Sequence, residues 1–292
     1  YPGSKPKLNK KAVDFGITLA LALESNIEPE LRFSRKNYFY PDMSKNFQIT
    51  QYEVPLASGG FLLVDDHRIG ITRVHLEEDP AKLTHVGGGI TNARETLIDY
   101  NRAGMPLVEI VTDPDIESTE EARAFLEKLS LILDHLGVYD PTAEGVLRVD
   151  ANISIEGGNR VEVKNITGFK NVEKALNYEV IRQKSAKNMG VDIVRETRHY
   201  DAGSGITSTL RLKEDEEDYG YIAEPDLVKT NLTEDWIGRM KASMPELPDQ
   251  RINRLELQYG IPRFQASIIV RTGLQMSEFF EKSCRLHDDQ KE

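Results

Sequence analysis

The stretch Leu107-Val108-Glu109-Ile110-Val111 places one carboxylate in the middle of an aliphatic, β-branched run. Such a run predicts a strand that is buried on both faces. A buried carboxylate is strongly destabilising unless a cation or several hydrogen-bond donors meet it. One interpretation is a structural ion pair between Glu109 and an arginine such as Arg102. The other interpretation is a functional carboxylate, and the acidic segments elsewhere in the chain bear on the choice.

Two further acidic segments favour the functional interpretation. Arg73-Val74-His75-Leu76-Glu77-Glu78-Asp79 ends a predicted strand in carboxylates, and Arg148-Val149-Asp150-Ala151-Asn152 begins another. Several carboxylates on the strands of one domain predict a site for a divalent cation with oxygen ligands. His75 is a candidate ligand or general base beside them, although a lone histidine is more often structural.

Residues 148–164 predict a β-hairpin, because apolar and polar residues alternate on both sides of a glycine-containing turn. We expect a three-residue loop at 157–159, which would set Asn152 opposite Lys164. The hairpin would then have one apolar face and one polar face. The polar face would carry Arg148, Asp150, Asn152, Glu162 and Lys164. Such a face suits either solvent or the floor of an active-site cleft.

The remaining pattern predicts an α+β protein with antiparallel sheets. Asn9 can cap a helix that reaches about Ser25, and the capping box Ser118-Thr119-Glu120-Glu121 opens another helix. A third helix is expected over residues 171–187. From Thr233 onward the chain changes to short helical segments separated by prolines. We therefore place a domain boundary near residues 230–245.

Composition narrows the class of protein. The 292 residues carry a net charge of −11, with 39% hydrophobic and 29% charged residues. This balance argues against a general nucleic-acid coat, although a local basic patch could still bind RNA. The single cysteine, Cys284, excludes an internal disulfide or a cysteine-based zinc site within these residues and fits a reducing cytoplasm. No apolar run approaches the roughly 18 residues of a membrane span.

The common catalytic and nucleotide-binding motifs are absent. The sequence contains no GxxxxGK[ST], GxGxxG, GxSxG or HExxH pattern. Gly87-Gly88-Gly89 is too short for a phosphate cradle, and a flexible loop is expected there. Arg35-Lys36-Asn37-Tyr38 offers cations and donors that suit a phosphate or a ribose hydroxyl, with a solvated strand end as the alternative. The residues alone thus indicate a metal-dependent carboxylate site, and phosphoryl transfer is the leading hypothesis.

Several long blocks of the chain resemble the family formed by the B subunit of glutamyl/aspartyl-tRNA amidotransferases. The resemblance covers nearly the whole chain, and the B subunit is favoured because there is no room for the inserted domain of the related archaeal E subunit. One family segment usually reads Asp-Tyr-Arg-Tyr-Phe-Pro-Glu-Pro-Asp, whereas here Gly220 replaces its Arg and Ala223 its first Pro. The matching blocks are residues 35–42, 75–79, 99–110, 148–154, 161–165 and 224–226.

The resemblance implies a fold and a domain organisation. Residues 1–240 would form an antiparallel cradle domain similar to glutamine synthetase, and residues 241–292 would begin a helical domain. The family's first strand, with a Gly-Leu-Glu-x-His pattern, and its tail domain are expected to lie outside these residues. The chain is therefore expected to be a fragment of the complete protein.

The resemblance also implies an activity in the cytoplasm. ATP and Mg²⁺ would activate the side-chain carboxylate of Glu-tRNA(Gln) or Asp-tRNA(Asn) as an acyl phosphate. Ammonia from a partner amidase, the A subunit of the enzyme, would then displace the phosphate, in a complex that also contains a small C subunit. Mg²⁺ and basic groups suit this reaction, because phosphorylating a carboxylate brings two anions together.

The resemblance and the residue chemistry together suggest roles for individual residues. Glu78 and Glu109 match the metal-binding positions of the family, and Asp150 and His75 lie in its active-site blocks. The candidate cofactor-binding residues are Arg35, Lys36, Asn37, Tyr38, Arg148, Asn152 and Lys164. Two alternatives remain: a free-standing carboxylate–amine ligase for a small molecule, and a non-catalytic tRNA-binding scaffold. The scaffold has no need of Glu109 in an apolar strand.

Overall fold

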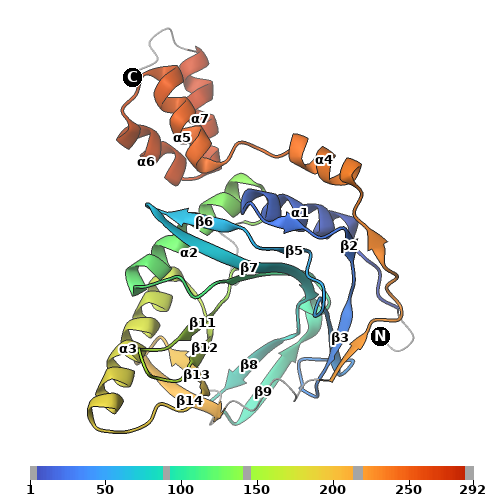
Figure 1. Cartoon of the computed structure of the whole chain (residues 1–292), viewed down its shortest axis with the longest axis vertical. Helices are drawn as coiled ribbons and strands as arrows, with labels where there is room; N and C mark the ends of the chain where they lie inside the picture. The colour runs from blue at the N-terminus through green and yellow to red at the C-terminus, as the bar shows by residue number, and fades with distance from the viewer. Residues whose placement is uncertain (1–4, 88–92, 141–145, 213–219, 287–292) are drawn as a thin grey trace.

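The structure, a computed structural model, describes residues 5–87, 93–140, 146–212 and 220–286. Within these ranges several small sheets and seven α-helices form a mixed α/β protein (Figure 1). A central sheet lies next to α1, and most of the other sheets are arranged around the side of it that faces away from this helix. Gly88 and Gly89 of the predicted glycine loop lie outside the described residues.

The central sheet is antiparallel, and its longest strand joins the others. Its strands are β1 (Asn26–Ile27), β5 (Ala57–Ser58), β6 (Phe61–Val64), β7 (His67–Glu78) and β10 (Pro106–Thr112). Within the described residues β10 pairs with β7 alone, so it is an edge strand. Val108 and Ile110 pack against the core, whereas the Glu109 side chain is 50% exposed. The prediction that this strand is buried on both faces is therefore wrong, because no layer covers the Glu109 face.

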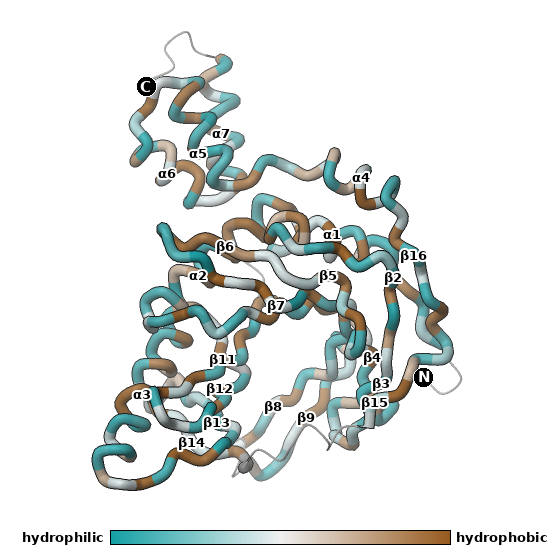
Figure 2. The backbone as a smooth tube through the Cα atoms, viewed as in Figure 1, coloured by the Kyte–Doolittle hydropathy of each residue, from teal (hydrophilic) through white to brown (hydrophobic). Residues whose placement is uncertain are grey.

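Two helices cover the core face of the central sheet. They are α1 (Lys10–Ala22) and α2 (Thr119–His135). Both predicted N-caps are confirmed: Asn9 Oδ1 accepts from the backbone N–H groups of residues 11 and 12, and Ser118 Oγ accepts from Glu121 N. The main core lies between these helices and strands β5, β6 and β7, and it continues into buried residues of the segment 163–200. Figure 2 accordingly shows hydrophobic segments along α1, α2 and β6.

A three-stranded sheet meets the unpaired edge of β7 through side chains. It contains β15 (Gly220–Ala223), β3 (Ser34–Asn37) and β4 (Phe47–Thr50), in that order. Gln51 Oε1 accepts from Leu76 N at 2.8 Å, and Gln48 Nε2 donates to Glu78 O at 2.8 Å. Both glutamines are buried. These bonds satisfy the backbone of β7 without a continuous ladder, so the three-stranded sheet can turn away from the central sheet (Figure 1).

A four-stranded sheet contains the predicted hairpin. Its strands are β11 (Val149–Ile153), β12 (Val161–Ile166), β13 (Glu196–Asp201) and β14 (Ile206–Leu212). β12 and β13 are parallel and are joined by helix α3 (Phe169–Asn188), whereas the other two pairs are antiparallel. The expectation of purely antiparallel sheets is thus wrong here, because a crossover helix returns the chain in the same direction.

The register of the hairpin differs from the prediction. Asn152 lies opposite Glu162, not opposite Lys164, and the connection is longer than three residues. Over residues 151–153 and 161–163 this shift of two residues keeps each side chain on its predicted face, and the register changes again between Val149 and Ala151. Val161 and Val163 are fully buried, whereas Asp150 and Asn152 are exposed. The separation into an apolar and a polar face is therefore confirmed.

The remaining elements are short. Two strand pairs are β2 (Glu30–Leu31) with β16 (Thr230–Asn231), and β8 (Lys82–Val86) with β9 (Glu95–Asp99), which η1 (Tyr100–Arg102) follows. The C-terminal helices are α4 (Glu234–Ala242), α5 (Pro248–Tyr259), α6 (Arg263–Arg271) and α7 (Leu274–Leu286). Helices α5 to α7 share a buried cluster of their own.

Candidate active site

The pairing of β7 with β10 brings together a histidine and two carboxylates. Glu109 lies directly opposite His75, and Glu77 follows two residues later on the same face of β7. His75 Nε2 is 3.4 Å from Glu109 Oε2 and 4.0 Å from Glu77 Oε2. One possible ligand atom from each residue lies within 4.8 Å of the other two. We call His75, Glu77 and Glu109 the acidic cluster.

The charges of the acidic cluster are unevenly balanced. The hydrogen bond from His75 is the main cause that lowers the pKa of Glu109, and it outweighs the opposing effect of burial. Burial is the main cause that raises the pKa of Glu77, and the negative charge of Glu109 adds to it. The Glu77 side chain is 12% exposed, and His75 Nδ1 is buried without a hydrogen-bond partner. Two neighbouring carboxylates of this kind are suited to share a divalent cation.

Glu78, which we predicted to hold a metal together with Glu109, lies on the other face of β7. Strand alternation turns it away from Glu77, and its carboxylate forms an ion pair with Lys45 and accepts from Ile49 N at 3.0 Å. The structure therefore groups Glu77, not Glu78, with Glu109. The period of two in β7 could have revealed this, because it places Glu77 and His75 on one face.

Two lysines from other sheets lie close enough to the acidic cluster to stabilise the charged forms of its carboxylates. Lys36 on β3 favours the charged forms of Glu77 and Glu109, and Lys164 on β12 favours that of Glu109. Burial disfavours the charged form of Lys164, but Asp150 and Glu162 outweigh it and raise its pKa to about 12. Lys164 Nζ is 2.8 Å from Asp150 Oδ2. The polar face of the hairpin thus points its cation towards the central sheet.

Other predicted site residues are engaged in structural contacts. Arg35 binds Glu224 through two hydrogen bonds of 2.8 and 3.0 Å, which supports the alternative of a structural strand end for this residue. Asn37 Nδ2 donates to Gly220 O at 2.6 Å. Tyr38 lies with its ring 5.8 Å from Lys36 Nζ. Asn152 stands opposite Glu162 on the polar face of the hairpin.

Asp79 connects the end of β7 to two arginines. Arg148 Nη2 is 2.7 Å from Asp79 Oδ1, and Arg102 Nε is 3.0 Å from Asp79 Oδ2. The suggested structural pair between Glu109 and Arg102 is therefore wrong, since Arg102 is bound by Asp79. The contact of Arg148 with Asp79 instead fixes the start of β11 beside the end of β7.

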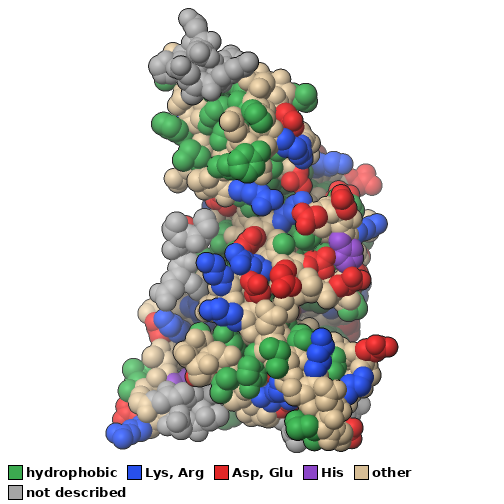
Figure 3. Space-filling view, turned by 90° about the vertical axis from the view of Figure 1, so that its left-hand side faces the viewer, with side chains coloured by type: hydrophobic (Ala, Val, Ile, Leu, Met, Phe, Trp, Pro, Cys, Tyr) green, Lys and Arg blue, Asp and Glu red, His purple; other side chains and the backbone are tan. Residues whose placement is uncertain are grey.

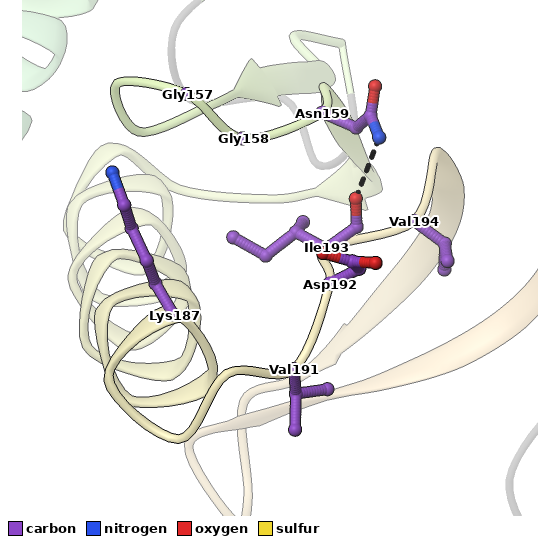
Figure 4. Close-up of a pocket in the computed structure, with 8 residues that line it drawn as sticks. All are labelled: Gly157, Gly158, Asn159, Lys187, Val191, Asp192, Ile193 and Val194. Carbon is purple, nitrogen blue, oxygen red and sulfur yellow. Dashed lines mark hydrogen bonds between the residues drawn. The ribbon is translucent and has the colours of Figure 1, made fainter.

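A cavity of about 300 Å³ lies elsewhere, at the loop of the β11–β12 hairpin (Figure 4). It is lined by Gly157, Gly158, Asn159, Lys187 and residues 191–194. Lys187 Nζ donates to Glu156 O at 2.6 Å, and Asn159 Nδ2 donates to Ile193 O at 2.9 Å. No predicted catalytic residue lines this cavity.

The site combines a carboxylate cluster on the open face of a sheet with lysines from two other sheets. Such a site is typical of proteins that bind a divalent cation together with an anionic ligand. The chain matches the GatB/GatE catalytic domain over residues 1–238 and belongs to that family. No helix in the described part of the chain is long and apolar enough to span a membrane.

Similar proteins are named as the B subunit of aspartyl/glutamyl-tRNA(Asn/Gln) amidotransferase. The protein of Methanosarcina acetivorans is 50% identical over 287 residues, which are 97% of this chain and 57% of that protein. The Saccharolobus solfataricus protein is 49% identical and covers 96% of this chain and 60% of its own length. The Sulfolobus acidocaldarius protein is 46% identical, and the match covers 99% of this chain and 62% of that protein. The chain thus spans about three fifths of the length of these relatives.

Proposed function

We propose that the protein containing this chain uses ATP and Mg²⁺ to amidate misacylated tRNA. Its substrates would be Glu-tRNA(Gln), Asp-tRNA(Asn) or both, and the products Gln-tRNA(Gln) and Asn-tRNA(Asn). Relatives that are about half identical carry the corresponding name. The observation that carries the proposal is the acidic cluster flanked by Lys36 and Lys164.

In the first step an oxygen of the substrate carboxylate would attack the γ-phosphorus of ATP. The bond from this phosphorus to the bridging oxygen breaks, and ADP leaves with an acyl phosphate as the product. In the second step ammonia attacks the carbonyl carbon, phosphate leaves, and the nitrogen loses a proton. Lys36 and Lys164 would offset the negative charge that gathers when two anions meet.

Glu77 and Glu109 fit Mg²⁺, because both supply carboxylate oxygens within 4.8 Å of each other. When bound, the ion would neutralise charge on the phosphates. The hydrogen bond from His75 would keep Glu109 ionised and oriented. Glu78 remains a predicted ligand, but its ion pair with Lys45 would have to break first. Asp150 would orient Lys164 through their ion pair.

We further propose that the protein works in the cytoplasm within a complex. The name of its relatives refers to one subunit of a larger enzyme. The partners would be an amidase, which releases ammonia from glutamine, and a small third subunit. Residues 1–240 would form the catalytic domain, similar to the cradle of glutamine synthetase. Residues 241–292 would begin a helical domain, which the separate buried cluster of α5 to α7 supports.

Phosphate release from ATP by the complete enzyme tests this function. Turnover should require the enzyme's own misacylated tRNA and glutamine or ammonia, and comparing Glu-tRNA(Gln) with Asp-tRNA(Asn) defines the substrate. Turnover with a free amino acid in place of tRNA would favour the small-molecule ligase. tRNA binding without any ATP turnover would favour the scaffold. Figure 3 shows acidic and basic side chains intermixed on one face, where an RNA scaffold would favour an extended basic patch.

Three matched glutamine variants test the metal assignment. Glu77→Gln and Glu109→Gln keep the shape of the side chain but remove one negative charge from the acidic cluster. We expect tRNA-dependent ATP turnover to fall by orders of magnitude in both. Glu78→Gln, one residue along the same strand, is the control. A large loss in Glu78→Gln with near wild-type turnover in Glu77→Gln would refute the Glu77 assignment and restore the original one.

A further inference from the structure

Two tyrosines form a stacked pair beside the acidic cluster. The rings of Tyr52 and Tyr221 lie with their centroids 3.8 Å apart and their planes 12° from parallel. Tyr221 belongs to β15 and Tyr52 follows β4, so β3 lies between the strands from which they come. Tyr52 is 46% exposed although Tyr221 covers one face of its ring. Almost half of the residue thus remains accessible to a ligand.

Two contacts place the stacked pair close to the acidic cluster. Tyr221 lies directly opposite Lys36 in the pairing of β15 with β3, so both side chains share a face of the three-stranded sheet. Two residues before Tyr52, Thr50 Oγ donates to Glu77 Oε2 at 3.2 Å. The stacked pair thus lies near both Lys36 and Glu77.

An arginine next to Tyr52 binds backbone carbonyls. Arg73 Nη1 donates to Tyr52 O at 3.2 Å, and its Nη2 donates to Gln51 O. Its Nε is buried without a hydrogen-bond partner, and no carboxylate of the described residues pairs with it. Arg73 precedes His75 by two residues on β7 and lies on the same face. The Arg73 guanidinium thus lies against the backbone from which Tyr52 projects.

We propose that the exposed part of the Tyr52 ring stacks the adenine base of a nucleotide whose phosphates extend past Lys36 towards the acidic cluster. This subsite deepens the proposed function and rests on it. Every nucleobase can stack on an aromatic ring, and an adjacent cation favours the attached phosphates. The adenine has two possible sources, ATP and the terminal adenosine of the tRNA. Arg73 acts as a positioning residue, because it holds the backbone from which the Tyr52 ring projects.

Nucleotide binding to the complete enzyme tests the subsite. Tyr52→Leu removes the ring, and we expect the dissociation constant of Mg-ATP to rise about tenfold, as for loss of one base–aromatic stack. The affinity for inorganic tripolyphosphate, which has no base, should stay within about twofold. Tyr52→Phe keeps the ring and should restore wild-type binding. Phe264→Leu on α6, where the side chain is 75% exposed, is the control for loss of an exposed aromatic.

The two sources of adenine give different results. If the base belongs to the tRNA, Tyr52→Leu raises the KM for aminoacyl-tRNA about tenfold and leaves Mg-ATP binding unchanged. The subsite is refuted if a folded Tyr52→Leu protein keeps both constants within twofold of the wild type. It is equally refuted if tripolyphosphate binding falls as much as that of Mg-ATP. Because binding of the non-hydrolysable analogue AMP-PNP requires no turnover, an inactive wild type would refute the proposed function and still allow this comparison.

Discussion

The acidic cluster should make the protein less stable at neutral pH when no divalent cation is bound, and Glu77→Gln tests this. Charged oxygens of Glu77 and Glu109 no more than 4.8 Å apart repel by about 3 kcal/mol at an effective dielectric constant of about 20. Half of the Glu109 side chain is exposed, and His75 and Lys36 offset part of the repulsion. After screening by solvent and the effect of these partners, we expect the free energy of unfolding of the variant to exceed that of the wild type by about 1 kcal/mol.

The pH dependence of this gain has a defined sign. Burial and Glu109 raise the pKa of Glu77 in the folded protein, so the folded state holds this proton more tightly than the unfolded state. Its contribution to stability is therefore present below the unfolded pKa of about 4.3 and is lost as the pH rises through the higher folded value. At neutral pH the variant should melt about 2–4 °C above the wild type, and below about pH 4 the difference should vanish.

Calorimetry of the full-length protein with EDTA and with Mg²⁺ measures both effects. Mg²⁺ at ten times its dissociation constant should stabilise the wild type by about 1.4 kcal/mol, because it binds only the folded state. The Glu77→Gln variant should lose most of this gain, so Mg²⁺ reverses the order of the two melting temperatures. A variant that melts below the wild type in EDTA at neutral pH would show that repulsion does not dominate the cluster. Full stabilisation of the variant by Mg²⁺ would contradict the ligand assignment.

Three other substitutions probe the surroundings of the site by urea denaturation. Lys45→Ala breaks the ion pair with Glu78 and should lower stability by about 1 kcal/mol, and an unchanged midpoint would show that this pair contributes nothing. Arg198→Met leaves Glu179 buried without one of its cations and should cost about 3 kcal/mol or more, whereas a loss below about 1 kcal/mol would contradict that reasoning. Ser118→Ala removes the N-cap of α2 and should cost about 1 kcal/mol, with Ser118→Asp restoring most of it.

Local features of the fold could be predicted from the sequence, and partners across the fold could not. The caps at Asn9 and Ser118 depend on atoms two or three residues away, so the sequence contains all the information they need. The pairing of β12 with β13 depends instead on where α3 returns the chain. In the segment 196–201, the buried Arg198 binds Glu179 and donates to Thr207 and Thr209 of β14, and the buried Glu196 accepts from Thr209. The buried charges of this segment therefore hid the strand from a search for apolar alternation.

The candidate site was predicted only in part, because it too depends on partners that are distant in the sequence. Glu109 and His75 stood out because of their strands, and the structure brings them together. Which acidic residue joins them depends on strand alternation in β7, which places Glu77 and not Glu78 on the face of His75. The expected burial of Glu109 was wrong, because the residues of a strand do not show whether another layer packs on each of its faces. The group that meets it is the imidazole of His75, from the neighbouring strand, and Arg102 is bound by Asp79.

A single extra residue in β7 determines which side chains face the site. The pairing of β7 with β10 shifts between Val111 and Thr112, so that Val111 lies opposite Arg73 and Thr112 opposite Ile71. Thr72 is the extra residue of this bulge. Before it Ile71 is buried in the core, and after it Val74 is, so the core-facing side chains change from odd to even positions. His75 and Glu77 would otherwise point towards α1. Their place on the open face, opposite Glu109, thus depends on the bulge rather than on the residues of the cluster.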